Sequence, residues 1–175
     1  DPAWYRLGVR LLVVHPPLSV ARDFIDYPYF SDLGAVQLAT VLAATAEVVL
    51  VDAFALPAAS LAERPDGRLH LGASVAQTLA AIPPGDFDAV LVAYTPFHRP
   101  PHRDDVLAET LASLRHRHPH APLLLVDAYQ SGQHYVEVGG DAVLESYPEV
   151  DAWVKYEAER TVPALLERWH EHGER

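Results

Sequence analysis

Five short apolar runs divide the chain, and they limit the folds available to it more than any other feature. In each run, apolar and β-branched residues follow one another without the alternation expected of a half-exposed strand. Continuous runs of this kind are typical of strands covered on both faces, as in a parallel sheet. The runs are "VRLLVV" (9–14), "EVVLVDA" (47–53), "DAVLVAY" (88–94), "PLLLVDA" (122–128) and "DAWVKY" (151–156).

Helical patterns separate these runs, and we expect helices over 33–45, 74–82, 103–117, 140–147 and 161–172. Alternating strands and helices predict an α/β fold with helices on both faces of the sheet. We therefore predict a three-layer flavodoxin-like or Rossmann-like domain, with a five-stranded parallel sheet in the order 2-1-3-4-5. The 175 residues suit a single domain, 1–175, with its core at about 8–170.

Two connections in this scheme are long, and long loops in compact domains are often functional. The first connection (15–32) follows the first strand and is rich in aromatic residues. The second (54–73) follows the second strand and contains "RPDGR", a turn signal, and "RLHLG", a candidate hairpin strand. We expect both connections to lie near the carboxyl ends of the strands.

Composition excludes several classes of protein. The formal net charge of −11 disfavours binding to a nucleic-acid backbone, so no nucleic-acid partner is expected. No apolar run approaches the ~20 residues of a membrane span, and a cytoplasmic location is the expectation. Cysteine is absent, which excludes disulfides, thiolate metal sites and iron–sulfur clusters within this chain. Methionine is absent too, even at position 1, and we expect the chain to be processed, trimmed or one part of a longer protein.

The predicted topology indicates where a ligand would bind. Open α/β sheets bind ligands beyond the carboxyl ends of their strands, near the point where strand order reverses. The stretch "AYTPFHRPPHRDD" (93–105) follows the third strand and so belongs to this edge. We expect Tyr94, Thr95 and Phe97 to contact a ligand there. His98, with Arg99 and His102, is expected at the rim.

Sites for phosphate-containing ligands are not supported by the sequence. The G-x-G-x-x-G fingerprint of dinucleotide-binding domains is missing after the first strand, where the next glycine is Gly34. A Walker loop is also missing. Receiver domains share this topology but need a phosphorylated aspartate after the third strand, and this strand runs into "AYTPF". We therefore reject dinucleotide binding and phosphoacceptor signalling.

Metal binding and nucleophilic catalysis are the remaining chemical options. His98 and His102 are four residues apart, but two prolines between them disfavour a helical metal-binding pair. The histidines of "RHRHPH" (115–120) are interpreted as a solvated helix end, so we predict no metal site. Ser131 lacks the G-x-S-x-G elbow. A small α/β enzyme acting through Asp127, His134 and His98 stays as a minor alternative, and no catalytic residue is assigned.

The order of several short motifs resembles the cobalamin-binding domain at the N-terminus of many radical SAM enzymes. In that family the first strand ends in Asn-Pro-Pro, matched here by "HPP" (15–17), and the first helix has a Gly-rich start, matched by "LG" (33–34). The third strand runs into Thr-Pro, matched by "TP" (95–96). Gly-Glu-Gly-Glu follows the fifth strand, where this chain has "YEAE" (156–159). The resemblance covers roughly residues 8 to 169.

This resemblance implies a corrinoid, cobalamin, held across the carboxyl edge of the sheet. The iron–sulfur cluster and S-adenosylmethionine would belong to a radical SAM barrel in a missing downstream domain, or to a partner chain, so this chain alone is expected to be non-catalytic. The family has Gly-Gly after the fourth strand, which leaves room for the cobalamin nucleotide tail, and here side chains replace it. The implied cofactor-binding residues are His15, Pro16, Pro17, Leu33, Gly34, Tyr94, Thr95, Pro96, Phe97, Asp127, Ala128, Tyr129, Gln130, Tyr156 and Glu157.

A second interpretation keeps the fold without the ligand. In it the domain is a degenerate, non-binding Rossmann-like domain, and its carboxyl edge serves as an interface for a protein or a neighbouring domain. Aromatic and apolar residues suit a planar ligand and a protein interface alike, so composition leaves both open. A closed edge would favour the interface, and a well-formed cavity would favour the ligand.

Overall fold

The computed structural model describes residues 8–23, 33–98, 103–128, 139–155 and 157–172. Its main sheet contains five parallel strands: β1 (Arg10–His15), β3 (Glu47–Asp52), β6 (Ala89–Tyr94), β7 (Leu123–Asp127) and β8 (Ala152–Val154). They lie in the order β3-β1-β6-β7-β8. In chain order this is 2-1-3-4-5, and the prediction of a flavodoxin-like sheet is confirmed.

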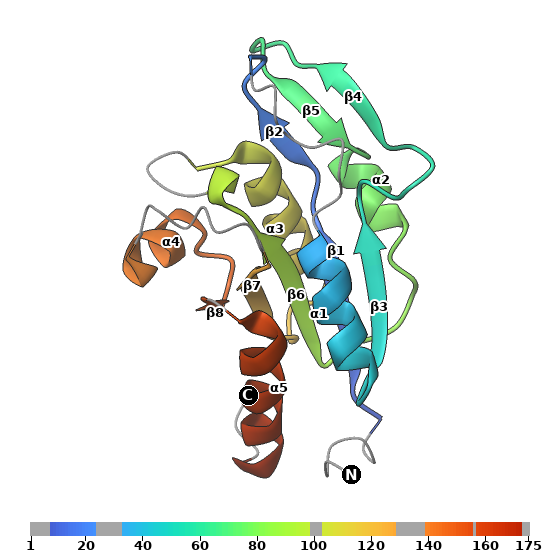
Figure 1. The fold of residues 1–175 in the computed structure, drawn as a ribbon, viewed down its shortest axis with the longest axis vertical. Coiled ribbons are helices and arrows are strands. Elements are labelled where there is room, and N and C mark those ends of the chain that lie inside the picture. Colours follow the sequence, from blue (N-terminus) through green and yellow to red (C-terminus); the bar gives the residue numbers. More distant parts are fainter. Residues whose placement is uncertain (1–7, 24–32, 99–102, 129–138, 156, 173–175) are drawn as a thin grey trace.

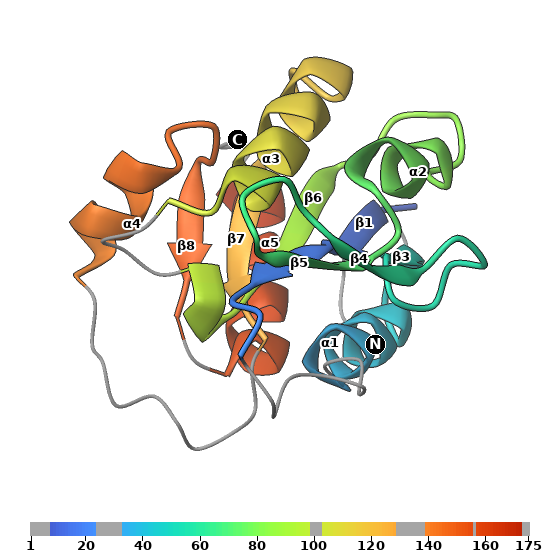
Figure 2. The same cartoon turned by 90° about the horizontal axis from the view of Figure 1, so that it is seen from above.

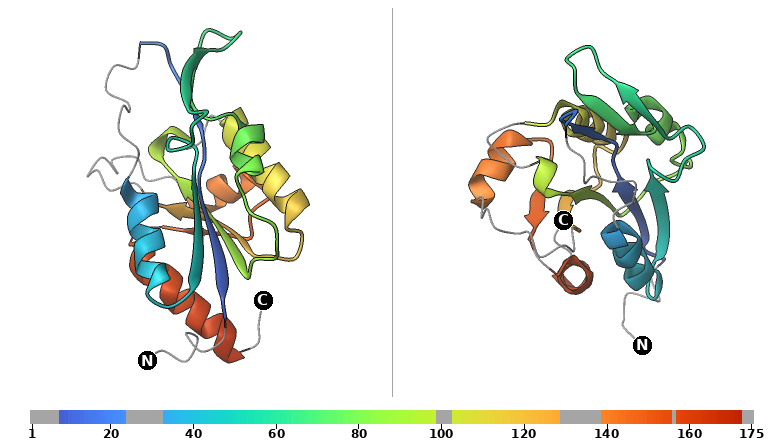
Figure 3. Two further views of the ribbon diagram at one scale, coloured as in Figure 1. Left: turned by 90° about the vertical axis from the view of Figure 1, so that its right-hand side faces the viewer. Right: turned by 45° about the horizontal axis from the view of Figure 1, so that its top comes forward.

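Helices cover both faces of this sheet (Figures 1 and 3). One face carries α1 (Leu33–Ala43) and α5 (Ala158–His172). The other carries α2 (Val75–Ala80), α3 (Asp105–Arg117) and α4 (Gly140–Ser146). The sheet separates two hydrophobic cores, and alternate residues of a strand point into opposite ones. Leu11 and Val13 face α1 and α5, while Leu12 and Val14 lie in the opposite core. Cover on both faces explains why apolar residues follow one another without alternation in the three central strands β1, β6 and β7.

A second, smaller sheet was not predicted as such. It is antiparallel, in the order β2-β5-β4, and consists of β2 (Leu18–Val20), β4 (Ser60–Glu63) and β5 (Leu69–Gly72). The hairpin signal around 64–72 is confirmed. Residues 18–20, however, were assigned to a loop, because a three-residue strand directly after two prolines has no pattern of its own. These residues become a strand through their pairing with β5.

The small sheet lies beyond the carboxyl ends of the main strands, at the top of Figure 1. Leu18, Val20 and Leu71 form a separate core there, with Phe54 and Leu69 packed against it. In the view from above, β4 and β5 cross the region where β1 and β3 end (Figure 2). Part of the edge that the sequence assigns to a ligand is therefore covered by the protein itself. Of the helices described, none is long and apolar enough to cross a membrane.

Candidate functional site

A buried histidine–aspartate pair ends the first two parallel strands. His15 closes β1 and Asp52 closes β3, and the strand register places them opposite each other. Nδ1 of His15 lies 3.0 Å from Oδ1 of Asp52, and the side chains are 1% and 8% exposed. Burial alone would raise the pKa of Asp52, but the hydrogen bond and charge of His15, with the amide of Phe54, outweigh it and lower that pKa. The His15 ring stacks on Phe54, with centroids 4.8 Å apart.

The stretch after the third parallel strand folds back on itself. β6 ends at Tyr94, and a short 3-10 helix, η2 (Pro96–His98), follows. The backbone N–H of Thr95 donates to Nδ1 of His98 at 3.1 Å. His98 is completely buried, and burial, aided by the nearby His15, lowers its pKa to about 3. The prediction that His98 lies at the rim is therefore wrong: its ring caps its own turn, inside the protein.

Tyr147 fastens this turn to the rest of the domain. Its hydroxyl donates to the backbone oxygen of His98 at 2.7 Å and accepts the N–H of Asp104 at 3.0 Å. Burial raises the pKa of Tyr147 to about 12, so the hydroxyl keeps its proton and remains a donor. One buried phenol thus connects η2, the start of α3 and the end of α4.

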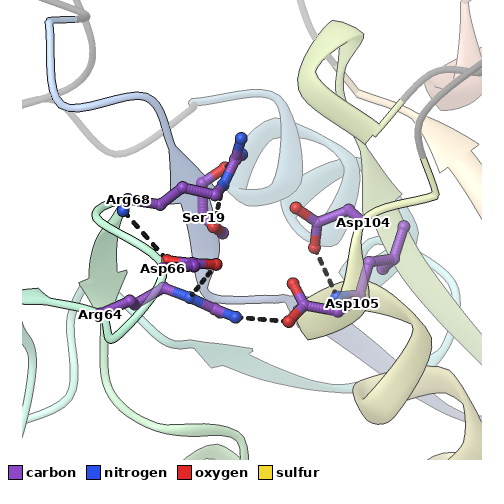
Figure 4. Close-up of polar contacts among 7 residues, drawn as sticks. Ser19, Arg64, Asp66, Arg68, Asp104 and Asp105 are labelled. Atoms are coloured by element: carbon purple, nitrogen blue, oxygen red, sulfur yellow. Dashed lines mark hydrogen bonds and ion pairs between the residues drawn. The ribbon is translucent and has the colours of Figure 1, made fainter.

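The start of α3 also receives the hairpin of the small sheet (Figure 4). The guanidinium of Arg64 forms an ion pair with Asp105, and Arg68 donates to Oγ of Ser19 at 2.7 Å. Asp104 caps α3 by accepting the N–H of Leu107 at 2.8 Å. Burial raises the pKa of Asp104, and the neighbouring Asp105 acts in the same direction. These contacts fix the small sheet over one side of the carboxyl edge.

A cavity of about 210 Å³ lies where the hairpin meets α3. Its lining includes Arg68 and Asp66 from the hairpin, Phe97 from η2, and Arg103 with Asp104 at the start of α3. Ligand pockets commonly measure ~300–1,000 Å³, so this cavity suits only a small group. It cannot enclose a corrin ring.

Gly34 brings the start of α1 into direct contact with the end of β7. A Cβ at position 34 would stand 1.4 Å from the backbone oxygen of Ala128. Gly34 and Ala128 are both buried, while Leu33 points outward and is 70% exposed. Only a residue without a side chain permits this approach.

This contact decides whether the described residues fit cobalamin. In the family that the sequence resembles, two glycines at the positions of Asp127 and Ala128 leave room for the nucleotide tail. Here both side chains are 6% exposed, and the Ala128 carbonyl is pressed against Gly34. Neither residue lines the 210 Å³ cavity. The described part of the edge therefore does not fit an inserted tail.

The structure brings some predicted site residues together and removes others from the surface. Around the end of the sheet it gathers His15, Pro16, Pro17, Thr95 and Asp127, all buried. Tyr94 is completely buried and packs edge-on against Trp153 and Tyr147, so its ring belongs to the core under α3 and α4. Phe97 is half-buried beside the small cavity, and Glu157 is exposed with a φ of 39°. Pro96 begins η2.

Several predictions fall outside the described residues. These concern Arg99, His102, Tyr129, Gln130, Ser131, His134 and Tyr156. The structure does add residues that sequence reasoning missed, namely Asp52 as the partner of His15, and Tyr147 with Asp104 as anchors of the turn. The Asp52 pairing had a signal, since both residues end adjacent parallel strands. Tyr147 had none, because it lies far from η2 in sequence.

The opposite end of the sheet holds a second cavity, of about 360 Å³, between residues 86–88 and 117–121. His118 borders it and is only 8% exposed, with its ring edge-on to Phe87 at 5.3 Å. Burial lowers the pKa of His118, and Arg117 contributes. The interpretation of "RHRHPH" as solvated is thus wrong for His118. Within the described residues, no group of three or more His, Asp or Glu side chains is placed to hold a metal ion.

Taken together, the strand order and the helix layers define a flavodoxin-like α/β domain. No protein-family model matches the chain, and no curated protein matches it. Among solved structures, the chain is similar to one described as the RcsB response regulator of Salmonella typhimurium, at a TM-score of 0.49 and 11% sequence identity. The match covers 95% of this chain and 61% of the RcsB chain.

Proposed function

We propose that this domain acts through the carboxyl edge of its sheet, as the cobalamin-binding domains that it resembles do, and that it docks there against a neighbouring domain or partner chain. In this role it does not enclose the nucleotide tail of a corrinoid. A radical SAM barrel is the partner that the resemblance implies. The contact of Gly34 with the Ala128 carbonyl carries the proposal, because the two backbones meet here without room for even a Cβ between them.

Three internal hydrogen bonds at the edge support this role. His15 pairs with Asp52, the Thr95–His98 turn bonds to itself, and Tyr147 ties that turn to α3. Such bonds hold the turn in one shape without a ligand. A preformed surface loses little conformational entropy on binding, which suits a domain interface.

A visible-absorbance titration with hydroxocobalamin and methylcobalamin, followed by gel filtration, tests the proposal. We expect an unshifted spectrum and free corrinoid in the included volume. A shifted spectrum with co-eluting corrinoid would contradict it. The double variant Asp127→Gly/Ala128→Gly restores the family's glycines but leaves the backbone contact with Gly34. We expect it not to bind either, because the obstacle is backbone as well as side chain.

Hydrogen exchange tests whether the carboxyl edge docks against a partner. A radical SAM barrel, supplied as a separate chain, should slow hydrogen exchange of the amides at Phe97 and in the first turn of α3. Exchange at residues 117–121, at the far end of the sheet, should stay unchanged and serves as the internal control. Equal rates with and without the barrel would count against the interface.

A corrinoid bound without tail insertion is the second candidate. It is favoured by two buried imidazole nitrogens at the edge, Nε2 of His15 and Nε2 of His98, which have no hydrogen-bond partner in the described residues. Cobinamide, a corrinoid without the nucleotide tail, separates the candidates. Binding of cobinamide but not of cobalamin would favour this second function and would still agree with the closed tail path.

A further inference from the structure

Two imidazole nitrogens at the carboxyl edge are buried without a hydrogen-bond partner in the described part of the chain. They are Nε2 of His15 and Nε2 of His98, on side chains that are 1% and 0% exposed. A buried polar atom left unpaired costs ~1–3 kcal/mol. Two such atoms from neighbouring strand ends indicate a place built to receive a polar group.

The bonds at the other ring nitrogens decide where the protons lie. Nδ1 of His98 accepts the backbone N–H of Thr95, which can only donate, so Nδ1 carries no proton and Nε2 carries it. Nδ1 of His15 faces the carboxylate of Asp52 at 3.0 Å, and its N–H donates there. With its proton on Nδ1, a His15 ring without a second proton offers a lone pair at Nε2. The site thus presents one donor, from His98, and one acceptor, from His15.

The two rings belong to one neighbourhood. β1 and β6 are adjacent, with Val14 opposite Val92. His15 is the next residue of β1, and the turn that begins at Thr95 starts three residues beyond Val92, at the same end of the sheet. The rings are also near enough for charge on His15 to affect the protonation of His98. One occupant can therefore engage both nitrogens.

This arrangement excludes two classes of occupant. A metal ion needs an unprotonated ligand nitrogen, and Nε2 of His98 bears the proton as long as Thr95 bonds to Nδ1. A carboxylate can only accept hydrogen bonds, so it would leave Nε2 of His15 unsatisfied, and any anion, phosphate included, would meet the charge of Asp52. A neutral group that both donates and accepts satisfies both rings.

We propose that His15 and His98 together bind one neutral donor–acceptor group, a primary carboxamide or a hydroxyl, of a small ligand at the carboxyl edge. Its oxygen accepts from Nε2 of His98, and its N–H or O–H donates to Nε2 of His15. The Asp52 carboxylate is a positioning group, because it fixes the tautomer of His15. The inference does not depend on whether that ligand is a corrinoid or on the docking role.

Nitrogen-detected NMR of the imidazole rings tests the proposal on the intact chain labelled with ¹⁵N. In the free protein we expect the Nδ1–H tautomer for His15 and the Nε2–H tautomer for His98. Acetamide, the simplest carboxamide, should then shift both Nε2 signals in a saturable way. Methanol replaces acetamide in a parallel titration and distinguishes a hydroxyl from a carboxamide. Sodium acetate, of the same size but acceptor-only, should have no saturable effect.

His118 provides the internal control, since its Nε2 is also buried and unpartnered but lies at the opposite end of the sheet. Its signals should stay unchanged during the titrations. Asp52→Asn should weaken acetamide binding at least tenfold while the fold, followed by the amide spectrum, is retained. Equal responses to acetamide and acetate, a response that does not saturate, or the opposite tautomer at His98 would overturn the proposal. A variant that fails to fold leaves the wild-type titrations to decide.

Discussion

The backbone oxygen of Ala128 stands where the Cβ of residue 34 would lie if that residue were not glycine, at only 1.4 Å from the added atom. The contact locks the first turn of α1 against the end of β7, on strands and helices that are far apart in sequence. Because the obstacle is rigid backbone, neither partner can yield without moving a helix or a strand.

Gly34→Ala should therefore destabilise the domain. We expect the free energy of unfolding to fall by about 1–3 kcal/mol, the usual cost of overpacking, despite the better helix propensity of alanine. Urea denaturation followed by circular dichroism measures this. Gly140→Ala, at the start of α4, is the matched control, since its added Cβ would have its nearest neighbour at 4.0 Å. A loss no larger in Gly34→Ala than in this control would contradict the close contact.

Tyr147→Phe should loosen the turn after β6. The change removes the hydroxyl that bonds the Asp104 N–H and the His98 oxygen and leaves both buried groups without that partner. We expect a loss of about 1–3 kcal/mol in unfolding free energy, together with faster hydrogen exchange at the Asp104 amide. An unchanged exchange rate at that amide would show that the phenol does not hold α3 to η2.

His98 should make the domain less stable in acid. Its pKa in the folded protein is lowered from 6.5 to about 3, so the unfolded chain binds the proton more readily. Stability is then fully present above pH 6.5 and is lost as the pH falls toward 3, by a few kcal/mol at full effect. Urea midpoints measured across this window should fall more steeply for the wild type than for His98→Gln, which cannot titrate. Parallel pH profiles would refute the assignment.

Asp104 should act in the opposite direction. Burial raises its pKa above 3.8, so the folded state favours the protonated acid. The contribution is present below pH 3.8 and is lost as the pH rises through the folded pKa. Asp104→Asn keeps an N-cap acceptor without the buried charge, and we expect equal or higher stability at neutral pH. Asp104→Ala is the control, and loss of the cap should cost about 1 kcal/mol. A clear loss in Asp104→Asn would mean that the charge itself stabilises α3.

The main sheet could be predicted because each of its strands is marked by a run of neighbouring apolar residues. Stretches such as 89–93 and 123–126 are apolar at every position, which is typical of strands covered on both faces. Their order then follows from the few ways in which such strands can be connected. β2 could not be predicted, since three residues after Pro17 become a strand only through pairing with β5.

The candidate site was predicted in place but not in detail. Sequence position put Tyr94, Thr95 and His98 at the carboxyl edge, and they are there. Alternation along β6 turned the Tyr94 ring into the core, and the Thr95 N–H drew the His98 ring inward. The orientation of each ring depends on which face the end of the strand turns toward the core and on which hydrogen-bond donor lies within reach. Residue type alone predicts neither.

The sequence by itself determined the class of fold, because hydrophobic period and chain connectivity are properties of neighbouring residues. Only the tertiary structure decided how closely α1 approaches the end of β7, since that depends on the separation of two backbones, at Gly34 and Ala128, that are 94 residues apart. The tertiary structure also decided which ring nitrogen carries the proton in His15 and in His98. A ring's tautomer follows from the partner that folding places beside it, here Asp52 and the Thr95 amide.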